Sequence, residues 1–149
     1  MTGSDEHGRV TDATVTAFYN MQVGHAHLMQ HLAAAHDLNP VDLRALKFLG
    51  AIDEDRTPKA LAIFLARGSG AVTALLDRLA QRGLLERVGN PEDRRSVRIT
   101  LTANGSALVD SLRAAYRDAL QHSAPAEHID LFIQLTNHVA RAFRQTNAG

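Results

Sequence analysis

The stretch SGAVTALLDRLAQRGLLERVGNPEDRRSVRITL, residues 69–101, decides the fold of this 149-residue chain. Between residues 72 and 79, apolar side chains recur every three or four positions, which is the spacing of one buried helix face. Gly83 follows, and glycine is the residue that most often occupies the left-handed position after a helix. The first half of the stretch therefore predicts an amphipathic helix that ends at Gly83.

The second half of the stretch predicts a β-hairpin. Residues 84–88 and 96–101 are short β-favouring runs, and in the second run Val97, Ile99 and Leu101 alternate with polar residues. The sequence GNPEDRR between the runs is rich in turn formers. A two-stranded hairpin is marginally stable by itself, so we expect it to pack on the neighbouring helices.

Two helix starts precede the stretch. Asn39 and Thr57 are capping residues, and each is followed by a proline at the first helical position. The second helix, from Lys59 to about Ala66, is short and almost wholly apolar, so we expect it to be buried. A short helix, a glycine-containing turn and an amphipathic helix form the outline of a helix-turn-helix. The hairpin directly after it makes the predicted lobe a winged helix.

Long segments with apolar faces flank this lobe on both sides, at residues 12–36 and 103–146. Thr102 caps the first helix of the second segment, and Pro125 separates it from a last helix at about 126–144. One short chain cannot cover both faces of such helices, so we expect them to form a dimerisation base. The sequence predicts a mainly α fold with a small β-hairpin (α+β), in a single domain of residues 1–149 with its winged-helix lobe at about 39–101.

Composition limits the classes of function. The chain has no cysteine, which excludes disulfides, thiolate-bound zinc and thiol redox sensing. Lys plus Arg and Asp plus Glu both total 16, yet residues 67–98 hold seven arginines against four acids. This modest basic patch suits a surface that meets DNA. No apolar run is long enough to span a bilayer and the first residues lack a signal-peptide pattern, so we expect a cytoplasmic protein without a membrane partner.

The decisive stretch, extended to LTANG, resembles regulators of the multiple-antibiotic-resistance (MarR) type. The resemblance consists of the recognition helix, its end at DRL…RGL, a wing with D-R-R, and the LT…G entry into the next helix. One departure is Ala60, where the family often has an acidic residue before Leu-Ala. The resemblance implies a homodimer that binds a pseudo-palindromic operator in double-stranded DNA. It also implies a repressor of adjacent genes that a small aromatic or anionic ligand releases.

In such a regulator the recognition helix enters the major groove with its N-terminal half toward the bases. Small or polar residues on that half let the backbone approach the bases or offer hydrogen bonds. The candidate DNA contacts on this helix are Ser69, Gly70, Ala71, Thr73, Ala74, Asp77 and Arg78. The alternative is that Ser69 serves only as the N-cap of this helix and that Thr73 is simply solvated.

The candidate contacts on the wing are Asp93, Arg94 and Arg95. An arginine at a wing tip can enter a narrow minor groove, where the potential is most negative. By family position Arg95 is the better candidate, and Asp93 would orient an arginine. We expect Arg78 and Arg82 to contact phosphate or to brace the wing, with Asp77 paired to one of them. The alternative for the wing is a solvated charged turn.

A ligand pocket is expected between the wing lobe and the terminal helices. Its candidate lining residues, which an ordinary core or dimer seam would equally use, are Phe18, Tyr19, Met21, His25, Leu43 and Phe48. His27 and His31 lie four residues apart, a spacing that suits two metal ligands on one helix face. Without an identifiable third ligand we expect no metal and no cofactor, although a metal-responsive regulator stays an alternative. A small histidine-dependent enzyme would need a nucleophile motif or phosphate loop that the sequence lacks, so we expect no enzymatic activity.

Overall fold

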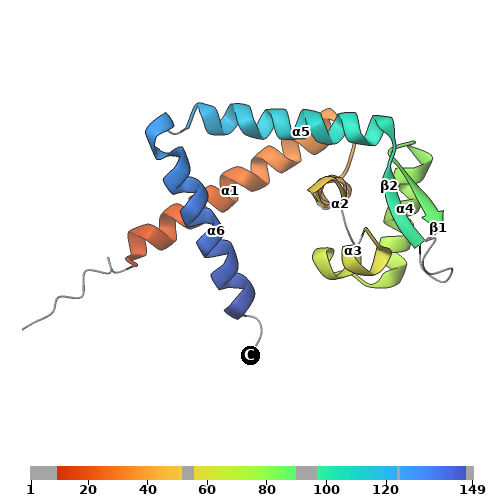
Figure 1. The fold of residues 1–149 in the computed structure, drawn as a ribbon, viewed down its shortest axis with the longest axis horizontal. Coiled ribbons are helices and arrows are strands. Elements are labelled where there is room, and N and C mark those ends of the chain that lie inside the picture. The colour runs from red at the N-terminus through yellow and green to blue at the C-terminus, as the bar shows by residue number, and fades with distance from the viewer. Residues whose placement is uncertain (1–9, 52–55, 90–96, 124, 147–149) are drawn as a thin grey trace, which may run out of the picture. The chain divides into compact units, whose positions relative to one another are not determined.

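A computed structural model describes residues 10–51, 56–89, 97–123 and 125–146 of the chain. Six α-helices, one short 3-10 helix (η1) and a two-stranded antiparallel sheet make up the described residues (Figure 1). In chain order they are α1 (Asp12–Ala35), α2 (Pro40–Ala51), α3 (Pro58–Leu65), α4 (Ser69–Gln81), β1 (Leu85–Gly89), β2 (Val97–Leu101), α5 (Ala103–Gln121), η1 (Ala126–His128) and α6 (Ile129–Thr146). The predicted mainly α fold with one hairpin is confirmed.

The chain divides into two compact units, Met1–Ala107 and Leu108–Gly149. The first unit contains α1 to β2 and the first turn of α5, which includes all of the predicted winged-helix lobe. The second contains the rest of α5, η1 and α6. That all 149 residues form a single domain stays a prediction.

The helix starts are set by the capping residues that the sequence indicated. The Asn39 side-chain oxygen accepts a hydrogen bond from the backbone N–H of Asp42 at 2.8 Å. The Thr57 hydroxyl accepts one from the backbone N–H of Ala60 at 3.1 Å. Ala60 is thus the third residue of α3, where an acid would complete a capping box. An acid at this position, which the family often has, would therefore stabilise the N-terminus of α3 and would not serve as a DNA contact.

The lobe has the geometry of a helix-turn-helix. Helix α3 ends at Leu65, and Ala66 turns the chain with a left-handed φ of 50°. After three residues α4 begins, and the two helices are bent by 110° relative to each other. In the described part of the chain no single helix is long and apolar enough to cross a membrane.

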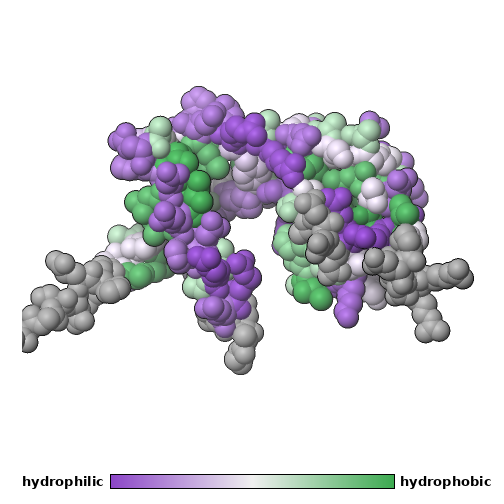
Figure 2. Space-filling view, in the orientation of Figure 1, coloured by the Kyte–Doolittle hydropathy of each residue, from purple (hydrophilic) through white to green (hydrophobic). Residues whose placement is uncertain are grey.

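The expectation that α3 is buried is wrong for one of its sides. Leu61 and Leu65 are buried, but Ile63 is 73% and Phe64 42% exposed. Figure 2 shows the apolar surface that results over this helix. Composition did not distinguish the sides because both faces of the ALAIFLA run are apolar.

The hairpin packs on the helices through its buried residues. Leu85 pairs with Leu101 and Arg87 with Ile99, in antiparallel register. Ile99 is fully buried, and its backbone N–H donates to the carbonyl oxygen of Arg56 at 2.7 Å. This bond attaches β2 to the segment that leads into α3. The predicted hairpin is confirmed, whereas its tip at residues 90–96 lies outside the described residues.

The passage from the hairpin into α5 depends on Thr102 and Gly105. The Thr102 hydroxyl donates to the carbonyl oxygen of Gly83 at 2.6 Å and accepts from the backbone N–H of Gly105 at 3.1 Å. A Cβ atom at Gly105 would lie 1.9 Å from the carbonyl oxygen of Leu84. The LT…G pattern is thereby explained by a helix cap and a close backbone approach.

We predict that Gly105→Ala lowers the free energy of unfolding by about 1–3 kcal/mol, because the Leu84 backbone must move to admit the methyl group. The matched control is Gly24→Ala in α1, where a Cβ meets nothing within 4 Å. It should be neutral or stabilise by up to about 1 kcal/mol through helix propensity. Urea unfolding followed by circular dichroism measures both changes. Equal stability of the two variants would contradict the close approach.

Candidate DNA interface

Helix α4 has a buried face and an exposed face of different chemistry. Val72, Leu75, Leu76 and Leu79 are buried and hold the helix in the lobe. All of the predicted DNA contacts on α4 lie outside this apolar stripe and are exposed, namely Ser69, Gly70, Ala71, Thr73, Ala74, Asp77 and Arg78. Over its first two turns the exposed surface is small and uncharged. A backbone presented in this way can approach a flat or grooved partner closely.

The N-terminus of α4 is open. Gly68 is the N-cap residue and supplies no side-chain hydrogen bond. Ser69 is the first helical residue, so the alternative in which Ser69 caps the helix is wrong. The backbone N–H groups of the first turn point out of the helix end, where the helix dipole favours an anion. This end of α4 is therefore suited to a phosphate.

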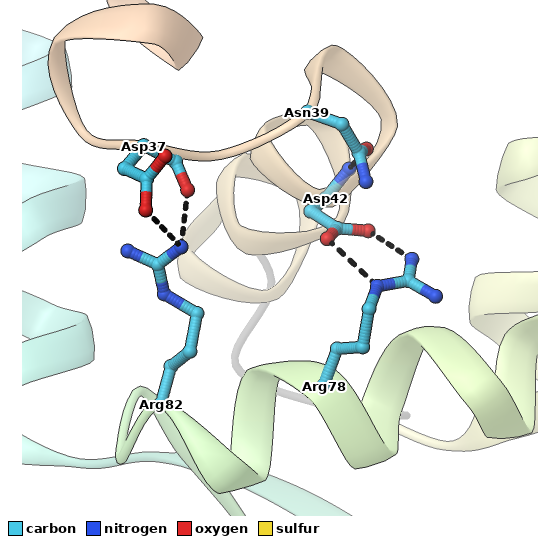
Figure 3. A network of polar contacts seen from close by, with 5 residues as sticks. All are labelled: Asp37, Asn39, Asp42, Arg78 and Arg82. Carbon is cyan, nitrogen blue, oxygen red and sulfur yellow. Dashed lines mark hydrogen bonds and ion pairs between the residues drawn. The ribbon is translucent and has the colours of Figure 1, made fainter.

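Arg78 is engaged with the start of α2. Its Nη2 atom lies 2.7 Å from Asp42 Oδ1 and its Nε atom 3.3 Å from Asp42 Oδ2, a bidentate pair (Figure 3). Asp42 is only 4% exposed, although it lies in the first turn of a helix. The hydrogen bond from Arg78 and the negative charge of Asp42 raise the pKa of the arginine, so the guanidinium stays charged.

Arg82, the C-cap residue of α4 and one turn after Arg78, is engaged with the end of α1. Its guanidinium donates to the backbone carbonyl oxygens of Asp37 and His36, the second bond with a length of 2.9 Å. It also lies 3.6 Å from the Asp37 carboxylate (Figure 3). We expected Arg78 and Arg82 to contact phosphate or to brace the wing. In the structure both of them reach the junction between α1 and α2.

Asp77 pairs with Arg87 of β1, and not with Arg78 or Arg82 as we expected. Arg87 Nη2 lies 2.8 Å from Asp77 Oδ1 and donates to the Thr73 carbonyl oxygen at 3.2 Å. The sequence analysis did not identify Arg87 as the partner of Asp77, although the alternation of side chains along β1 indicated a polar contact for it. A period of two places it on the same face of β1 as the buried Leu85. An arginine on the core side of a strand needs a polar partner nearby.

The three wing candidates, Asp93, Arg94 and Arg95, lie within residues 90–96 and thus outside the described residues. Gly89 and Val97, the last pair of the hairpin before its connecting loop, flank this segment. The wing contacts stay a prediction.

The candidate pocket residues do not share one environment. Leu43 is fully buried in the core of the first unit, whereas Tyr19, Met21 and His25 are exposed on α1. Phe18 is half-buried. Phe48 is also half-buried and stacks on Phe64 of α3, with ring centroids 4.3 Å apart and an interplanar angle of 19°. Leu43 is thus a core residue, and the lining of a pocket by the others stays a prediction.

A group of cationic side chains lies beside this aromatic pair. The Arg44 guanidinium lies 5.7 Å from the Phe64 ring centroid. Partial desolvation, and then the charges of Lys47 and Arg44, lower the pKa of His25. Partial burial, and then the charge of Arg44, lower the pKa of Lys47. The lowered pKa values indicate a positive electrostatic potential around these side chains, and an anion would be stabilised there. We call Arg44 and Lys47 the cationic cluster, with His25 as its neighbour on α1.

The described residues do not assemble a metal centre. Among them, no group of three or more His, Asp or Glu side chains is placed to hold an ion. His27 and His31 are both exposed on α1. The pair expected from sequence as a possible start of a metal site thus gains no third ligand within the part of the chain that the structure describes.

Comparison with known proteins places these features in one family. A family model described as "MarR family" matches residues 36–96, from the end of α1 into the hairpin. The multiple antibiotic resistance protein MarR of Salmonella typhimurium is 32% identical over 110 residues, which cover 68% of this chain and 66% of that protein. The chain therefore spans slightly less than two thirds of that relative's length.

Two further proteins extend the comparison. The HTH-type transcriptional repressor YetL of Bacillus subtilis is 28% identical over 113 residues, 73% of this chain and 68% of that protein. The crystal structure of the S. aureus MepR-DNA complex matches the fold with a TM-score of 0.60 and 21% identity, over 85% of this chain and 98% of that one. The fold and the sequence thus point to the same group of proteins.

Proposed function

The chain belongs to the MarR family, and from this premise we propose that it is a transcriptional regulator that binds double-stranded DNA as a homodimer and represses adjacent genes. A small aromatic anion releases it from the DNA. The Bacillus relative is named a repressor, and the S. aureus MepR structure contains DNA, which supports the first part of the proposal.

One observation carries the proposal of DNA binding. Helix α4 presents a small, uncharged face with an open N-terminus, and it stands at 110° to α3 with a hairpin beside it. This is how a winged helix presents its recognition helix to the major groove, where first-turn amides meet phosphate and short side chains meet base edges. Arg94 and Arg95 would add a minor-groove contact from the wing.

Exposed apolar faces support the homodimer. In α6 the residues Phe132, Leu135, Val139 and Phe143 recur at helical spacing and are exposed, Leu135 to 55%. In α1, Val15, Tyr19 and Met21 are also exposed. Monomeric proteins rarely expose apolar faces of this extent, and a second copy of the chain would cover them. We propose that both helices take part in the dimer interface.

The cationic cluster beside the Phe48–Phe64 pair supports the proposed effector class. An aromatic carboxylate would place its charge near Arg44 and Lys47 and its ring against the exposed part of Phe64. Because α2 and α3 carry these residues, a ligand there would lie on the helices that support α4. The pocket assignment of His25 and Phe48 is kept in this proposal, while Leu43 belongs to the core.

We predict that Ala74→Glu lowers affinity for the DNA flanking the protein's own gene about tenfold or more, because a carboxylate on the exposed face of α4 would meet phosphate. Ala80→Glu is the matched control, with the same charge at the other end of the same helix, and should have a smaller effect. Fluorescence anisotropy at physiological salt measures both. If Ala74→Glu binds as the wild type does, α4 is not the DNA-facing element.

We predict that Leu135→Glu converts the dimer to monomer in sedimentation velocity, because a charge cannot be buried unpaired in an apolar interface. Gln134→Glu adds the same charge at an exposed position one residue away and should leave the dimer intact. A wild-type protein that sediments as a monomer at micromolar concentration would refute the homodimer itself.

We predict that Arg44→Gln weakens binding of benzoate about tenfold in calorimetry, through loss of the charge-assisted contact. Arg141→Gln removes an exposed arginine of α6 and should bind benzoate as the wild type does. If both variants match the wild type while benzoate still binds, the effector site lies elsewhere. If the wild type binds no substituted benzoate, the proposed ligand class is wrong.

A further inference from the structure

Arg78 of α4 and Arg82, the C-cap residue that follows α4, bind the junction at which α1 ends and α2 begins. Arg78 and Arg82 are four residues apart, so they project from the same side of α4. Arg78 reaches Asp42, in the first turn of α2, and Arg82 reaches the backbone carbonyl of Asp37 after α1 (Figure 3). Arg82 also donates to the backbone carbonyl of His36. These contacts join parts of the chain that are more than 35 residues apart in sequence.

The contact at Asp42 cannot be exchanged freely for a contact with DNA. The Asp42 side chain is 5% exposed, and both of its carboxylate oxygens accept from Arg78. The Asp42 N–H is bound separately by the Asn39 side chain, which fixes the backbone at this point. If Arg78 turned toward a phosphate, a buried carboxylate would lose its cation, which is strongly unfavourable.

The contact at Arg82 completes the C-terminus of α1. The chain leaves α1 through Asp37, whose φ of 52° is left-handed, and Leu38 N–H returns to the Ala33 carbonyl at 2.8 Å. The last turn of α1 contains no basic residue of its own. The guanidinium of Arg82 therefore supplies the positive charge that the negative end of a helix favours. The end of α1 and the end of α4 are joined by this side chain.

We infer that Arg78 and Arg82 are positioning residues that clamp α4 to the α1–α2 junction, and that the affinity for DNA depends on this clamp rather than on phosphate contacts by these two arginines. The inference rests on the proposed function, and it gives Arg78 a different role from the DNA contact expected from sequence. A shift of α1 relative to α2 changes the distance between the two anchor points. The clamp thus links the proposed dimerisation helix to the proposed recognition helix.

The clamp and a phosphate contact make opposite predictions for Asp42. If Arg78 binds phosphate, Asp42 competes for it, and Asp42→Asn should leave DNA affinity unchanged or increase it. If Arg78 positions α4, Asp42→Asn should reduce the affinity as much as Arg78→Ala does. A lost phosphate contact also lowers the slope of log K against log salt by about 0.9, whereas a lost positioning contact leaves that slope unchanged.

The test measures DNA affinity by anisotropy from 50 to 300 mM salt for Asp42→Asn, Arg78→Ala and the double variant. We expect about a tenfold loss for each single variant, no further loss for the double variant, and the wild-type salt slope throughout. A slope reduced by about one in Arg78→Ala, or an Asp42→Asn variant that binds as well as the wild type, would overturn the inference. Asp110→Asn is the control, because it neutralises a carboxylate paired with Arg113 on α5.

Arg82 is tested by comparing lysine and alanine at its position. Lysine keeps a cation near the carbonyls of His36 and Asp37, so Arg82→Lys should retain more DNA affinity than Arg82→Ala. All variants are compared at a temperature where circular dichroism shows them folded. Equal affinity of Arg82→Ala and the wild type would overturn this half of the clamp.

A measurement made without DNA separates the clamp hypothesis from the proposed function. Amide hydrogen exchange in residues 79–83 reports how firmly the end of α4 is held. The clamp predicts faster exchange there in Arg82→Ala than in Arg82→Lys, even if the wild type binds no DNA. Unchanged exchange in both variants would overturn the clamp, whatever the DNA measurements show.

Discussion

The buried carboxylate of Asp42 is the constraint on which the pose of α4 depends. It follows Asn39 and Pro40, which start α2, and lies 4% exposed opposite the guanidinium of Arg78. A carboxylate in this position requires a cation and several hydrogen bonds, and the geometry that supplies them is narrow. Close packing of the leucines of α4 holds the helix in the core, and the bidentate ion pair adds a directional contact on its polar side. The polar contact thus adds a restraint on the side of α4 that its apolar face does not hold.

Part of the arginine excess near α4 serves the protein itself. Arg78, Arg82 and Arg87 are three of the seven arginines between residues 67 and 98, and each of them binds protein atoms. Their charges still contribute to the potential around the lobe, since only Asp42 among their partners is buried. The local net charge read from the sequence therefore overstates how many cations are free to meet phosphate. A greater share of the proposed affinity then depends on the wing and on the fit of α4.

Local features of the fold could be predicted from the sequence, whereas contacts between distant residues could not. Asn39, Thr57 and Thr102 were identified as helix caps because a cap acts within three residues of itself. The partner of Arg78 lies 36 residues away, and nothing in the periodicity of either helix identifies it. For the same reason the exposure of Ile63 was missed, because the composition of α3 does not say which of its two apolar sides faces the core. The exposed residues of the candidate interface were predictable because one apolar stripe determines the opposite face of the helix.

A recognition helix with a small contact face requires an accurate position. Long side chains such as arginine can adjust to a displaced groove by changing rotamers, but Gly70 and Ala74 have no such freedom. With these residues at the surface, contact with DNA depends on where the backbone lies, and a gap of about 1 Å forfeits about half of the van der Waals attraction. The uncharged face of α4 therefore requires an accurately placed backbone. The two arginines that bind the α1–α2 junction help to place it. The less a helix can adjust through its own side chains, the more its position must be determined by the scaffold that supports it.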